Sequence, residues 1–219
     1  MTRATAILLT LLASGTAPAA SIVVSVNDVK NRPVDQVVVE LEALAGDHAT
    51  AAPRNAAAQH ATIDQHDLQF VPEISVVHTG TAIDFPNSDN IRHQVYSFSP
   101  AKTFQLPLYA GHVYPPLQFD KPGIVNVGCN IHDSMIGFIY VTDSPWFGKT
   151  GREGRLELTS VPAGEYRVHI WHPRLAADEA PLEFMLNVPA SGDAQLAMTL
   201  KHPMQAAPGN NASRKWKGY

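Results

Sequence analysis

Hydrophobic and polar residues alternate with a period of two along much of the chain, a pattern typical of β-strands with one buried face. The stretches 22–26 and 37–41 show it first, and a loop of turn-forming residues separates them. Similar short runs, divided by clusters of turn-forming residues, follow at 68–77, 81–85, 93–98, 123–129, 137–141, 156–158, 166–170, 182–188 and 196–200. Beyond residue 20, no long stretch has the 3.6-residue period of a helix. The pattern predicts an all-β protein built as sandwiches of short strands.

The alternation stops between residues 45 and 61, where alanine dominates. This segment is expected to be a connector with room for a helical turn. The chain has 219 residues, enough for one large domain or two small ones, and its 17 prolines and 14 glycines suit many turns. A domain boundary is therefore predicted near residue 60.

The first 20 residues have the layout of a cleaved secretory signal. Arg3 precedes an apolar run over residues 6–13, and small residues end the segment at Ala20. The run is too short to span a bilayer. The alternative is a buried N-terminal helix. We expect export to the periplasm, with cleavage changing the formal charge from -4 to -5 because Arg3 is removed.

Charge gives little direction about partners. A formal charge of -4 provides no basic surface for nucleic acid and no strong field for a cationic ligand. The basic residues near the C-terminus, Arg214, Lys215 and Lys217, lie in a polar stretch from residue 203 to 219 that is expected to be a solvated, disordered tail; partner docking is the alternative.

Cys129 is the single cysteine of the chain, so no intramolecular disulfide can form. A free thiol in an oxidising compartment is reactive unless it is buried or bound to a metal. His132 and Met135 follow it at a Cys-x2-His-x2-Met spacing, which one tight loop between two strands could fold around an ion. A buried, inert cysteine and a packing methionine are the alternatives.

Blue copper sites combine two histidines and one cysteine with a weak axial methionine. The second histidine must therefore come from elsewhere. His93 is the best candidate, because it starts a strand-like run directly after a turn cluster, 36 residues before Cys129. His78 and His112 remain alternatives.

Two segments resemble small cupredoxins such as amicyanin. Residues 123–141 are similar to their copper loop, with a strand, Cys-x2-His-x2-Met-x-Gly and a final strand. Residues 83–89, followed by His93-Gln94-Val95, are similar to the segment before the first histidine ligand. The resemblance covers about residues 61–143. It implies an eight-strand Greek-key sandwich, one type 1 copper held by His93, Cys129, His132 and Met135, and electron transfer with a periplasmic dehydrogenase or cytochrome c.

Three positions depart from the pattern of that family. Gln94 stands where cupredoxins usually have asparagine, Asn130 where they have serine or threonine, and Ile131 where proline is common. Residues beside the ligands orient them and tune the metal. These changes are expected to alter the reduction potential more than copper binding.

The flanking segments resemble a carboxypeptidase-regulatory-like β-sandwich, in residues 27–41 and again in 151–166. Each half alone has too few strands for a core. We therefore expect the cupredoxin segment, 61–143, to be inserted in one small sandwich built from 21–60 and 144–202. The combination resembles proteins labelled methylamine utilization proteins.

An enzyme is not expected. The chain has no His-x-His pair for the additional copper sites of multicopper oxidases, and a dinuclear copper A centre needs two cysteines. Two other classes remain open: a copper-holding or copper-delivery protein, and a binding module with structural copper that uses exposed Trp146 and Phe147. His169 and His172 flank Trp171 without a thiol or carboxylate at ligand spacing, so a structural role is expected for them.

Overall fold

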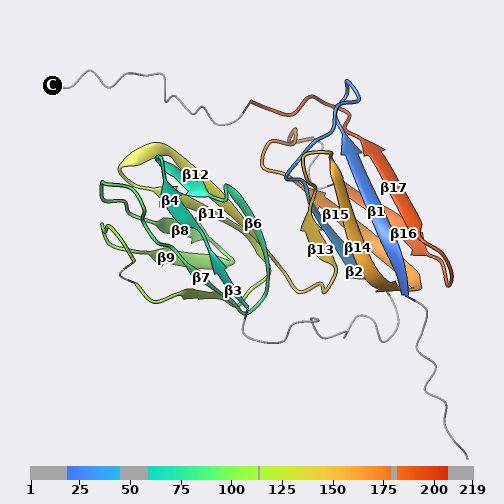
Figure 1. The fold of residues 1–219 in the computed structure, drawn as a ribbon, viewed down its shortest axis with the longest axis horizontal. Helices are drawn as coiled ribbons and strands as arrows, with labels where there is room; N and C mark the ends of the chain where they lie inside the picture. The colour runs from blue at the N-terminus through green and yellow to red at the C-terminus, as the bar shows by residue number, and fades with distance from the viewer. Residues whose placement is uncertain (1–18, 45–58, 113, 179–181, 207–219) are drawn as a thin grey trace, which may run out of the picture.

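The computed structural model describes residues 19–44, 59–112, 114–178 and 182–206. Within these ranges the regular elements are β-strands, with no helix (Figure 1). The prediction of an all-β sandwich fold is therefore confirmed. The described residues accordingly include no helix that could cross a membrane.

The middle of the chain forms two facing sheets and a short ribbon. The larger sheet has the order β6 (Ile74–His78), β12 (His132–Thr142), β11 (Gly123–Cys129), β8 (Tyr96–Ser99) and β9 (Lys102–Gln105). The facing sheet has the order β10 (Leu117–Phe119), β7 (Thr81–Asp84) and β3 (His60–Thr62), and the ribbon pairs β4 (Asp64–His66) with β5 (Gln69–Val71). Alternate residues of these strands point inward, so that Val125, Val127, Ile139 and Val141 fill a core together with Phe119.

The two flanks form a second pair of sheets. One has the order β14 (Arg155–Pro162), β1 (Ala19–Asn27) and β17 (Ala194–Thr199); the other has β13 (Phe147–Lys149), β2 (Val38–Ala43), β15 (Gly164–Trp171) and β16 (Leu182–Val188). Strand β1 pairs in parallel with β17, so the first and the last strand of the described chain lie side by side (Figure 1). Their apolar faces enclose a second core of residues drawn from both flanks. The insertion of one folding unit into another stays a prediction.

The two pairs of sheets are packed against each other through the outer face of β2 and β15. Val38 is fully buried, although it belongs to neither core. Its neighbours in β2 point into the second core, so the side chain of Val38 lies on the opposite face of the strand. Next to it, Glu40 accepts hydrogen bonds of 2.6 Å from the hydroxyls of Tyr140 and Thr142. Trp171 lies against the ring of Tyr140, with 5.8 Å between ring centroids.

Replacement of Val38 with aspartate is expected to lower the free energy of unfolding by about 3 to 5 kcal/mol, because an unpaired carboxylate would be buried between the sheets. Urea unfolding of the full chain measures this change. The control is Val29→Asp, at a position that is 41% exposed, where a change within about 0.5 kcal/mol is expected. Equal losses in the two variants would contradict burial of Val38.

Several sequence expectations need correction. The run 68–77 is two strands rather than one: β5 pairs with β4, whereas β6 pairs with β12. Trp146 is not exposed but buried in the second core, where its indole N–H donates to the Ser160 carbonyl. Residues 1–18, most of the predicted signal, lie outside the described residues, as do 45–58 of the connector. Ala20, the last residue of the predicted signal, is buried in β1.

The predicted start of the disordered tail, residue 203, is also wrong. Met204 packs against the second core, and the Gln205 amide donates to the Arg174 carbonyl at 2.9 Å. Packed structure therefore extends beyond residue 203, and residues 207–219 lie outside the described part of the chain.

Candidate metal centre

Two candidate ligands lie on either side of the turn of one β-hairpin. Strand β11 ends at Cys129 and β12 begins at His132, so only two residues form the turn between them. Because side chains alternate along β11, Cys129 follows Val125 and Val127 into the core and is 3% exposed. The pairing shifts between Gly128 and Cys129, which places Cys129 opposite His132. The local spacing in the sequence thus brings thiol and imidazole together.

The third candidate, His93, lies in the loop before β8 rather than at the start of a strand as predicted. Its backbone forms two hydrogen bonds of 2.9 Å with Tyr109, in an isolated β-bridge. Its side chain is fully buried. This bridge fixes the backbone of His93 beside the hairpin.

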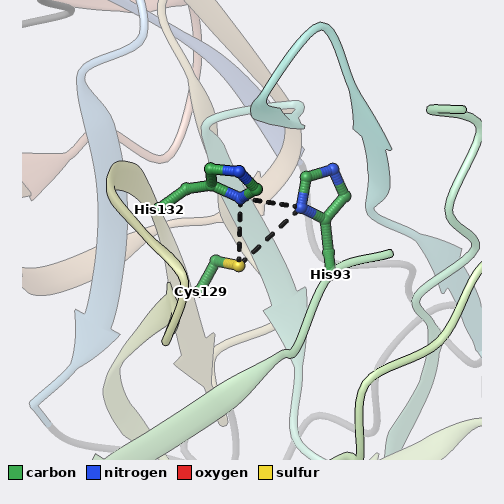
Figure 2. A group of neighbouring side chains, drawn as sticks. All are labelled: His93, Cys129 and His132. Atoms are coloured by element: carbon green, nitrogen blue, oxygen red, sulfur yellow. Dashed lines mark hydrogen bonds between the residues drawn. The ribbon is translucent and has the colours of Figure 1, made fainter. Parts of the chain in front are cut away.

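Figure 2 shows the three side chains pointing toward one another. The Cys129 sulfur lies 3.8 Å from Nδ1 of His93 and 3.7 Å from Nδ1 of His132, and the two nitrogens are 3.1 Å apart. The three distances define a triangle whose centre is about 2.1 Å from each atom, close to the metal–nitrogen and metal–thiolate bonds of about 2.0 and 2.3 Å found at zinc. The donor set and its spacing therefore fit a soft or borderline ion such as copper.

Asp89 fixes the ring of His93. Its Oδ2 lies 2.7 Å from Nε2 of His93 and accepts a hydrogen bond from the proton on that nitrogen. The opposite nitrogen, Nδ1, then carries the free lone pair that faces Cys129. Burial works against ionisation of Asp89, but hydrogen bonds from Leu68, His93 and Asp67 outweigh it and lower the pKa of the carboxyl. Sequence analysis missed this residue, although it lies four positions before His93 in the turn cluster.

His132 is only partly buried, at the edge of the group. Burial lowers its pKa, and the neighbouring His93 lowers it further. A neutral imidazole keeps a lone pair for a metal, so both effects favour binding at neutral pH.

The structure thus brings together three of the four predicted ligands. Met135 is buried in the same core as Cys129, and its role as the axial ligand stays a prediction. The alternatives to His93 lie elsewhere: the ring of His78 bonds the Thr79 and Asp143 carbonyls, and His112 pairs with Asp84.

The two histidines beside Trp171 have other partners. His169 pairs with Glu42 at 3.0 Å and with Glu183 at 3.3 Å. His172 is buried, and its Nδ1 accepts a hydrogen bond from the Arg174 amide. Burial lowers the pKa of this histidine to about 4. Neither belongs to a group of potential metal ligands among the described residues.

Exposed apolar side chains are found in the loops next to the candidate ligands. Ile131 lies directly before His132, Ile91 lies two residues before His93, and Leu68 donates its amide to Asp89. Their exposed fractions are between 42% and 50%. These loops therefore present apolar side chains to solvent close to the candidate site.

Parts of the chain are similar to solved structures of copper proteins. A purple cupredoxin from Nitrosopumilus maritimus is 20% identical, with 37% of this chain and 99% of that one covered and a TM-score of 0.33. A reduced amicyanin variant is 18% identical, with 42% and 90% covered and a TM-score of 0.36.

A copper-containing nitrite reductase from Thermus scotoductus is 22% identical, with 53% of this chain and 28% of that one covered and a TM-score of 0.36. No protein-family model matches the chain, and no curated protein matches it.

Proposed function

We propose that this protein is a type 1 copper protein that carries single electrons in the periplasm, with His93, Cys129, His132 and Met135 as its ligands. The observation that supports it most strongly is the convergence of one thiol and two imidazole Nδ1 atoms in a largely buried group. A bound copper ion would supply the one-electron couple between Cu(II) and Cu(I).

The chain's own contribution is to hold the ligand atoms still. The backbone of His93 is bonded to Tyr109 and its ring to Asp89, while the hairpin of β11 and β12 fixes Cys129 opposite His132. Ligands held by such bonds keep a similar arrangement in both oxidation states. Electron exchange then needs little rearrangement.

Burial favours a carrier over a copper-delivery protein. Delivery requires a second protein to reach the ligands and displace them one at a time. His93 is fully buried and Cys129 is 3% exposed, so neither is open to an incoming ligand. An electron, by contrast, can pass through the partly exposed edge of His132.

The apolar loops around that edge suit brief docking of a redox partner, because weak electron-transfer complexes use small surfaces. In line with the resemblance to amicyanin and to methylamine utilization proteins, we assign the partner to the periplasmic dehydrogenases or c-type cytochromes.

Voltammetry of the copper-loaded full chain tests this function. A reversible one-electron wave, with rapid reduction and reoxidation by a small soluble mediator, is expected. A protein that binds copper but shows no reversible wave would instead hold the ion for a structural or storage purpose.

Substitutions at Met135 should shift the reduction potential in opposite directions. Met135→Leu removes a thioether donor, which disfavours Cu(II) more than Cu(I), so the potential should rise while the colour persists. Met135→Gln offers a harder oxygen donor that stabilises Cu(II), so the potential should fall. Voltammetry of both variants gives the two signs. Wild-type potentials in both would make Met135 a packing residue.

A further inference from the structure

The turn between β4 and β5 has an unusual backbone conformation. The strands pair from Asp64 with Val71 to His66 with Gln69, which leaves Asp67 and Leu68 as a two-residue loop. Both have positive φ, 52° and 58°. Positive φ at both positions defines a type I′ turn, for which asparagine and glycine are preferred. Leucine in this left-handed region is unfavourable, so something outside the turn must hold it there.

The two amide groups of this turn point at one carboxylate. The Asp67 amide donates to Oδ1 of Asp89 at 2.7 Å, and the Leu68 amide donates to Oδ2 at 3.1 Å. Successive backbone N–H groups directed at one anion form a binding nest. Oδ2 is also the atom that lies 2.7 Å from Nε2 of His93. The carboxylate of Asp89 therefore links the turn to His93, a candidate metal ligand.

The ribbon is bonded to the loop that carries Asp89. The Gln65 amide donates to the Pro86 carbonyl at 3.0 Å, and the Ser88 amide donates to the Gln65 carbonyl at 2.9 Å. The Ser88 hydroxyl adds a bond of 2.7 Å to Asp64. These bonds fix the position of the turn along the ribbon relative to Asp89. The position of the nest thus follows from the register of the ribbon.

We infer that the Asp67–Leu68 turn is a positioning element for the metal centre, acting on His93 through Asp89. The nest holds the carboxylate with one oxygen toward Nε2 of His93, which keeps the proton on Nε2 and the lone pair on Nδ1. This inference rests on the proposed function for its purpose, but its structural part concerns the copper-free protein. The amides of Asp67 and Leu68 are bonded to Asp89 and act on His93 through it, so they are positioning residues.

Two hairpin variants separate the geometry of the turn from its side chains. Asp67→Asn with Leu68→Gly keeps a type I′ turn and both amides, while it removes the unfavourable leucine conformation. Asp67→Gly with Leu68→Ser favours a type II′ turn, in which the central peptide is rotated by about half a turn. The amide of residue 68 then points away from Asp89, and the carbonyl of residue 67 faces it.

The readout in the copper-free full chain is the tautomer of His93, from nitrogen chemical shifts of its imidazole. The wild type and the type I′ variant should show the proton on Nε2, whereas the type II′ variant should show the other tautomer as well. Copper affinity, from competition with a chelator, should fall by about 10- to 100-fold in the type II′ variant alone.

Replacement of Leu68 by its α-hydroxy acid gives a second test, because the ester keeps the side chain and removes only the N–H group. Like the type II′ variant, it should have a lower copper affinity than the wild type. Wild-type tautomer and affinity in both the ester and the type II′ variant would overturn the inference. The tautomer result stands apart from copper chemistry, so failure of the proposed function would leave it unchanged.

Discussion

The copper-loaded Cys129→Ser variant is expected to be colourless. The intense visible band of a type 1 site comes from charge transfer between a thiolate and Cu(II), and Cys129 is the only sulfur donor of that kind in the chain. Serine is nearly the same size, so the buried position should still be filled. Absorption spectra of both proteins at equal copper content measure the change.

Ser134→Ala is the matched control, because Ser134 is an exposed residue of the same hairpin. It should keep the full band. A band that persisted in Cys129→Ser would show that the colour arises from another group, and the assignment of the site would be wrong.

Asp89→Asn should produce the next largest effect, a loss of copper affinity of about 10- to 100-fold. The carboxylate of Asp89 accepts from three donors, which are the amides of Asp67 and Leu68 and Nε2–H of His93. Asparagine has one side-chain oxygen for these three donors, so its NH2 group must face at least one N–H group. A neutral amide also binds Nε2–H more weakly than a carboxylate does, so the ring of His93 is held less firmly with the lone pair of Nδ1 toward Cys129. Chelator competition measures the affinity.

Asp133→Asn makes the same change of charge at an exposed residue beside His132. It controls for the loss of a negative charge near the site and should leave copper affinity within a few-fold of wild type. Similar losses in the two variants would mean that Asp89 acts through its charge alone and not through the orientation of His93.

The hairpin ligands could be predicted from sequence because their geometry is local. Cys129 and His132 are three residues apart, and a two-residue turn between alternating strands brings them face to face. His93 needed a resemblance in addition, since its position depends on a bridge to Tyr109 that no short-range pattern reveals.

Asp89 and the turn that holds it were missed for a related reason. Type I′ turns are normally found in sequence by Asn-Gly or Asp-Gly, and Asp67-Leu68 lacks that signal. The contact between this turn and Asp89 also spans more than 20 residues. The break after Val71 was missed although Pro72 marks it, because apolar residues on both sides made 68–77 look like one run.

The burial of Trp146 shows the limit of local reading in the flanks. The tryptophan follows a proline in a segment without alternation, which suggested an exposed loop. In the structure its ring meets Tyr166 at 5.6 Å between centroids, inside the second core. Strands far apart in sequence create that core, so the burial of Trp146 could not be predicted from its neighbours in the sequence.

The most direct test of the proposed site is a titration of the purified full chain with Cu(II), followed by absorption and electron paramagnetic resonance spectroscopy. A type 1 site with a Cys129 thiolate predicts one copper per chain, an intense visible band and a narrow copper hyperfine splitting. A weak band with the wide splitting of ordinary Cu(II) sites, or no stoichiometric binding, would contradict it.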